Sequence, residues 1–64
     1  MHVNGKQISL NTPLTINAFL AKEGYDPQKI AVEKNGTIVP KQSFESEMLS
    51  ENDKLEIVCF VGGG

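Results

Sequence analysis

The sequence predicts an α+β domain in which one main helix lies across one face of a mixed β-sheet. Two Asn-Gly pairs each separate two short segments of alternating apolar and polar residues, a pattern typical of β-hairpins. A segment with helical spacing of apolar residues lies between the hairpins, and a longer apolar segment closes the chain. We therefore expect four or five strands around one helix.

The first hairpin is predicted from residues 1–3 and 6–10, which flank Asn4-Gly5. Asn and Gly readily take the positive φ values that a two-residue type I′ turn requires. In the second arm, alternation puts Ile8 and Leu10 on the same face. We expect that face to be buried.

A short helix is predicted after the first hairpin. The hydroxyl of Thr15 can accept a hydrogen bond from a free backbone N–H of the first helical turn. Gly24 lies where a left-handed residue would end the helix, and Asp26-Pro27 disfavours its continuation. The apolar residues follow the i, i+3, i+4 spacing of one helix face: Ile16, Phe19 and Leu20.

The second hairpin is predicted from residues 30–34 and 37–39, joined by Asn35-Gly36 and ending at Pro40. The segment 41–50 is less regular, and we expect Phe44 and Leu49 to anchor it, with one helical turn near Ser43. A turn at Glu51-Asn52-Asp53 then leads into the final strand.

The final strand, residues 55–61, is the longest and most apolar, so we expect it in the middle of the sheet. Alternation places four of its residues on the helix side: Leu55, Ile57, Cys59 and Val61. We interpret Cys59 as a small buried hydrophobe, because a buried thiol without a cationic neighbour keeps its proton and is a poor nucleophile.

The opposite side of the final strand carries Glu56, Val58 and Phe60. One helix can cover only one side of a small sheet, so Val58 and Phe60 are predicted to form an apolar docking surface with Glu56 as a polar neighbour. Two alternatives stay open, namely that segment 41–50 folds over these residues or that they are scattered surface apolar residues.

Composition excludes several function classes. Six lysines, no arginine and eight acidic residues give a net charge of −2, which argues against a nucleic-acid partner. One cysteine and one histidine provide neither a disulfide, nor a metal site, nor a catalytic pair. Clustered carboxylates in a polar loop are interpreted as solvated surface: Glu45, Glu47, Glu51 and Asp53. Without a signal sequence or membrane span, we expect a cytoplasmic protein.

The printed sequence ends with Gly62-Gly63-Gly64. We expect residues 1–61 to form the domain and residues 62–64 to form a flexible tail. Glycines without Cβ atoms can enter a narrow active site of another protein, but a frayed terminus has the same composition. The tail alone leaves both interpretations open.

Three segments carry a resemblance to a known family: VEKNGTIVPK at residues 32–41, the acidic turn at residues 51–53, and FVGGG at residues 60–64. In this order, and over the whole chain, they resemble ThiS, the sulfur-carrier family of thiamine biosynthesis. The resemblance implies a ubiquitin-like β-grasp fold.

The resemblance also implies a function and partners. Gly64 would be adenylated by an E1-like (ThiF-like) adenylyltransferase that consumes ATP, then converted to a thiocarboxylate with sulfur from a cysteine desulfurase or sulfurtransferase. A ThiG-like thiazole synthase would take that sulfur for the thiazole ring. Gly62 and Gly63 would let the tail enter a narrow channel. The chain would be a protein co-substrate, not an enzyme, with no bound cofactor, and a monomer when free.

Two alternatives remain at this point. The small subunit of molybdopterin synthase shares the fold, tail and activation chemistry, but is usually a longer chain. A ubiquitin-like interaction module or modifier belongs to a different class, in which the glycines either do not react or become conjugated to lysines.

Overall fold

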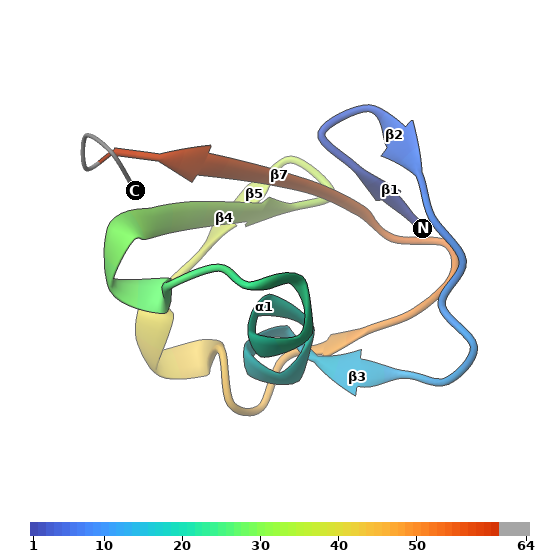
Figure 1. The fold of residues 1–64 in the computed structure, drawn as a ribbon, viewed down its shortest axis with the longest axis horizontal. Coiled ribbons are helices and arrows are strands. Elements are labelled where there is room, and N and C mark those ends of the chain that lie inside the picture. The colour runs from blue at the N-terminus through green and yellow to red at the C-terminus, as the bar shows by residue number, and fades with distance from the viewer. Residues whose placement is uncertain (61–64) are drawn as a thin grey trace.

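The computed structural model of the chain describes residues 1–60, and within them five strands form one mixed sheet (Figure 1). Its strand order is β2-β1-β7-β4-β5. The bounds are β1 His2–Val3, β2 Lys6–Gln7, β4 Ile30–Lys34, β5 Thr37–Val39 and β7 Lys54–Cys59. Strand β1 runs parallel to β7, whereas the other neighbours are antiparallel. The central position predicted for the final strand is confirmed.

Both predicted Asn-Gly turns are present. Asn4 and Gly5 have φ values of 52° and 81°, and Asn35 and Gly36 have values of 53° and 85°. These left-handed conformations are those of a type I′ turn. The strand after the first turn is shorter than the predicted 6–10, because the backbone N–H of Leu10 donates to the Glu51 carboxylate instead of a neighbouring strand.

Helix α1, Ile16–Glu23, lies beneath one face of the sheet (Figure 1). Thr15 Oγ1 accepts from the N–H of Ala18 at 3.1 Å, and Gly24 ends the helix with a φ of 83°, as predicted. The apolar side chains of α1 join buried residues of the strands and of the connecting segments in one core: Met1, Leu10, Ile16, Phe19, Leu20, Ile30, Val32, Phe44, Leu49, Leu55 and Ile57.

The segment between β5 and β7 lies beside the helix. It contains one short 3₁₀ helix, η2 (Lys41–Ser43), and one short strand, β6 (Met48–Leu49). Another short 3₁₀ helix, η1 (Pro27–Lys29), lies between α1 and β4. The side chains of Phe44 and Leu49 are buried, which confirms both anchors. Strand β6 pairs with β3, Leu14–Thr15, in a small second sheet. The sequence did not predict this sheet, because strands of two residues are too short to show an alternating pattern.

Backbone hydrogen bonds fix this segment on the helix side of the large sheet. The N–H of Ile16 donates to the carbonyl of Glu47, and the N–H of Asn17 donates to that of Phe44, both at 2.9 Å. The alternative that segment 41–50 covers the opposite face is therefore wrong. That face stays uncovered by the described elements.

Candidate functional site

The uncovered face of the large sheet carries the predicted docking residues. Val58 and Phe60 are each 57% exposed, and Glu56 is exposed beside them. Register adds residues from two neighbouring strands, because directly paired residues share a face. We call this set the open face: Ala31, Glu33, Ile38, Glu56, Val58 and Phe60.

Ile38 is the most exposed large apolar residue of the open face, at 68%, and sequence reasoning missed it. A signal was available. A two-residue turn at Asn35-Gly36 pairs Lys34 with Thr37 and Glu33 with Ile38, so Ile38 must point away from the buried side chain of Val32. The apolar part of the open face therefore extends across three strands.

Lys41 borders the open face at its C-terminal end. Its Nζ lies 5.1 Å from the centre of the Phe60 ring, within the range of a cation–π contact. The contact places a positive charge beside the last described aromatic residue. The apolar surface of the open face and the cation of Lys41 thus lie together at the C-terminal end of β7.

The end of β7 is held from both sides. The N–H of Phe60 donates to the Lys29 carbonyl at 3.1 Å on the β4 side. On the β1 side, Asn4 Oδ1 accepts from the Ile57 N–H at 2.7 Å, and Asn4 Nδ2 donates to the Ile57 carbonyl at 3.2 Å. Strand β7, which precedes the terminal glycines in the sequence, is therefore hydrogen-bonded on both sides near its C-terminal end. Val61 and the predicted reactive residues Gly62, Gly63 and Gly64 lie outside the described residues.

Comparison with known proteins gives the family. The model of the ThiS family matches residues 1–64. The chain belongs to the ThiS family. The β-grasp fold agrees with a solved ThiS structure from Geobacter metallireducens, which superposes with a TM-score of 0.81 and 27% sequence identity over 98% of this chain and 96% of that one. The predicted family and fold are both confirmed.

Relatives of the ThiS domain occur in two contexts. The sulfur carrier protein ThiS of Bacillus subtilis is 34% identical over 65 residues, covering 100% of this chain and 98% of that protein. A thiazole synthase of Paramagnetospirillum magneticum is 44% identical over 62 residues, and another from Magnetococcus marinus is 34% identical over 64. The ThiS domain spans only 19% and 20% of these two synthases.

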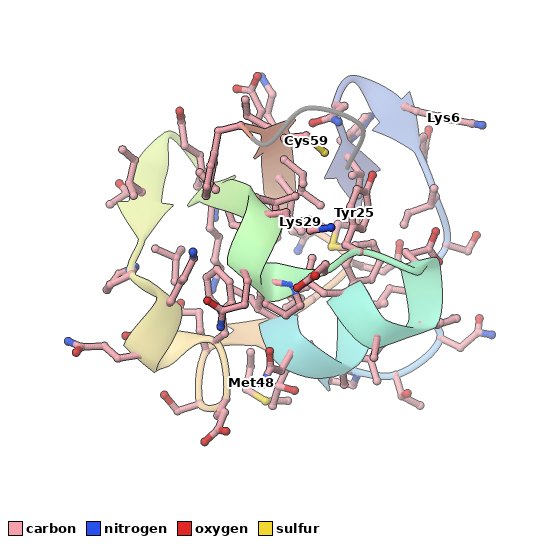
Figure 2. All side chains as sticks on the ribbon, turned by 60° about the vertical axis from the view of Figure 1, so that its left-hand side comes forward. Lys6, Tyr25, Lys29, Met48 and Cys59 are labelled. Carbon is pink, nitrogen blue, oxygen red and sulfur yellow. The ribbon has the colours of Figure 1, made fainter. Side chains whose placement is uncertain are left out.

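The burial predicted for Cys59 is wrong, because its side chain is exposed. It has the inward parity of Leu55 and Ile57, but the C-terminal end of β7 extends to one side of α1, so the helix does not cover it (Figure 1). Cys59 instead lines a recess of about 410 Å³ together with Tyr25 and Lys29 (Figure 2).

Of the four carboxylates interpreted as solvated surface, three have fixed partners: Glu47, Glu51 and Asp53. Glu51 Oε1 lies 3.1 Å from the Met1 ammonium, and Asp53 accepts from Asn35 Nδ2 at 3.0 Å. Burial acts to raise the pKa of Asp53, but hydrogen bonds from Asn35 and Ser50 and the charge of Lys34 together lower it. These groups stabilise the turn before β7.

Lys34 joins that turn to the segment beside the helix. Its Nζ lies 2.8 Å from Glu47 Oε2 and 3.8 Å from Asp53 Oδ2. The hydrogen bond to Glu47 raises the pKa of Lys34, against a smaller opposite effect of burial. Within residues 1–60, no three His, Cys, Asp or Glu side chains group as a metal site, and no helix could span a membrane.

Proposed function

We propose that this ThiS-family chain carries sulfur as a thiocarboxylate on Gly64 and supplies it for the thiazole ring of thiamine. The observation that carries the proposal is the family match over residues 1–64, which includes all three terminal glycines. The Bacillus subtilis relative of nearly equal length, named a sulfur carrier protein, supports the same conclusion. The proposal takes Gly64 to bear the free carboxylate.

The chemistry begins with activation, because a carboxylate is anionic and a poor electrophile. An E1-like adenylyltransferase transfers AMP from ATP to the Gly64 carboxylate and releases pyrophosphate. The outer sulfur of a persulfide, provided by a cysteine desulfurase or sulfurtransferase, attacks the acyl carbon and expels AMP. A thiol then cleaves the resulting S–S bond, leaving the Gly64 thiocarboxylate and a disulfide. Gly62 and Gly63 keep the approach narrow because they lack Cβ atoms.

In this proposal the chain is a co-substrate that is reloaded with sulfur after each transfer, and the adenylyltransferase is the protein that binds and consumes ATP. Val58 and Phe60 dock on the adenylyltransferase, with Glu56 as their polar neighbour. Their exposure beside the start of the tail supports this assignment, as does the added apolar area of Ile38. Thiazole synthase is the proposed acceptor, and the two synthases that contain a similar domain support that partnership.

Intact mass spectrometry tests the function. The protein is incubated with its adenylyltransferase, ATP, a persulfide-loaded desulfurase and a thiol that cleaves the acyl disulfide. The expected product has a mass gain equal to one oxygen replaced by one sulfur, and a variant without Gly64 shows none. The mass before reaction also establishes whether Gly64 is the last residue. A wild-type protein that is never adenylated would contradict the proposal, whereas covalent ladders on other proteins would identify a modifier.

A further inference from the structure

Two glutamates, one on β4 and one on β7, occupy the middle of the open face. Glu33 of β4 is paired directly with Glu56 of β7. Both side chains point away from the core, because their strand neighbours Val32, Leu55 and Ile57 are buried. Directly opposed residues of antiparallel strands have Cβ atoms about 4.5–5.5 Å apart, and like charges at that spacing repel. The free protein therefore maintains an unfavourable pair at this position.

No ion pair within residues 1–60 relieves this repulsion. The ion pairs found there join Met1 to Glu51 and Lys34 to Glu47 and Asp53. Lys34 follows Glu33 in β4 but points to the other face. Lys54 lies two residues before Glu56 in β7 and on the same face. Its Cα is roughly 7 Å from that of Glu56, at about 3.4 Å per residue.

Apolar side chains flank the two carboxylates. Ile38 is paired with Glu33 on one side, and Ala31 and Val58 form the next cross-strand pair toward the tail. A protein docked on these apolar residues would exclude water around the carboxylates. Charge interactions strengthen as water is excluded, so a cation brought by the partner would be attracted more strongly there than in the open.

We propose that Glu33 and Glu56 together receive one arginine guanidinium from the adenylyltransferase that docks on the open face. The inference rests on the proposed function and adds the charge that the partner must bring. Arginine fits better than lysine, because its planar group has five N–H donors, enough for two carboxylates, and is more weakly hydrated. Docking then replaces a repulsive pair with two attractive contacts, which selects for a cationic partner surface.

The test compares neutral variants with matched controls. Glu33→Gln and Glu56→Gln remove one charge each and keep the side-chain size. Glu23→Gln and Glu45→Gln do the same at exposed positions away from the open face. Each protein is measured for its thermal midpoint alone and for its Kd with the adenylyltransferase by calorimetry, at low and at moderate salt.

The expected effects on the two measurements have opposite signs. Glu33→Gln or Glu56→Gln should raise the thermal midpoint by about 2–4 °C, because repulsion is relieved. The same change should weaken binding about tenfold and reduce its salt dependence. The controls should change neither quantity appreciably.

Binding by both open-face variants that equals that of the controls would overturn the inference. So would weaker binding that accompanies a lowered thermal midpoint, because that would be a general loss of structure. ATP–pyrophosphate exchange on the wild-type protein distinguishes a failure of the arginine inference from a failure of the proposed function. If exchange occurs and the variants bind normally, only the arginine inference is wrong. If wild-type protein neither binds nor supports exchange, the proposed function fails as well.

Discussion

Glu51 holds the first residues of the chain against the turn before β7. One carboxylate oxygen contacts the Met1 ammonium at 3.1 Å, and the other accepts the backbone N–H of Leu10. The side chains of Met1 and Leu10 are both buried. The N–H of Leu10 first, and then the ammonium, lower the pKa of Glu51 from its ordinary value of 4.5.

We expect Glu51→Gln to destabilise the protein at neutral pH. A carboxyl whose pKa is lowered by folding stabilises the fold at any pH above its pKa in the unfolded chain. This contribution is lost as the pH falls through the pKa of the folded state. The difference between variant and wild type should therefore be full at pH 7 and shrink below about pH 4.5. Urea unfolding at pH 7 and at acidic pH measures it, with Glu45→Gln as control. A difference independent of pH would contradict the role of the charge.

At the scale of elements, Asn4 extends the pairing of β7 beyond the end of β1. Strand β1 is paired with β7 only at Lys54 and Leu55, and the Asn4 amide then supplies both a donor and an acceptor to Ile57. Asn therefore has two functions here. It takes the positive φ of the turn, and it satisfies the backbone of the strand that leads to the tail.

Replacing Asn4 with glycine separates these functions, since glycine keeps the positive φ without strain. We expect Asn4→Gly to cost about 1–2 kcal/mol for two lost hydrogen bonds and to speed amide exchange at Ile57. Asn4→Asp should have a smaller effect on that amide, because it keeps an acceptor oxygen. Hydrogen exchange and urea unfolding measure the two effects. Unchanged exchange at Ile57 would show that the side chain does not protect β7.

At the scale of the whole molecule, the core and the candidate site occupy opposite sides of one sheet. Helix α1 and the segment with η2 and β6 cover one side, as Figure 1 shows. The open face is left to the other side. Two phenylalanines illustrate the division, because Phe44 is 2% exposed and Phe60 is 57% exposed.

These two residues should therefore respond oppositely to substitution. Phe44→Ala should cost about 3–5 kcal/mol, comparable to the whole stability of a small domain, so circular dichroism should show a largely unfolded chain. Phe60→Asp should change stability by less than about 1 kcal/mol. It should nevertheless weaken adenylyltransferase binding at least about tenfold if the open face is the docking surface. Wild-type affinity in Phe60→Asp would exclude that surface.

Features of the fold that depend on near neighbours could be predicted from the sequence. The type I′ turns follow from Asn-Gly pairs, and the helix ends follow from Thr15 and Gly24. Strand parity separated the buried Leu55 and Ile57 from the exposed side of β7. The tail glycines lie outside the described residues, so their role stays a prediction.

The sequence by itself determined the order of the helix and of the strands of the large sheet, the two faces of β7 and the family, because these depend on local conformation, alternation and ordered motifs. Only the tertiary structure decided which distant residues meet. Glu33 opposes Glu56, and Glu51 reaches Met1, across separations that no local pattern encodes. Cys59 shows the reason most simply: alternation gave its direction correctly, but its burial depended on how far the helix extends beneath the strand.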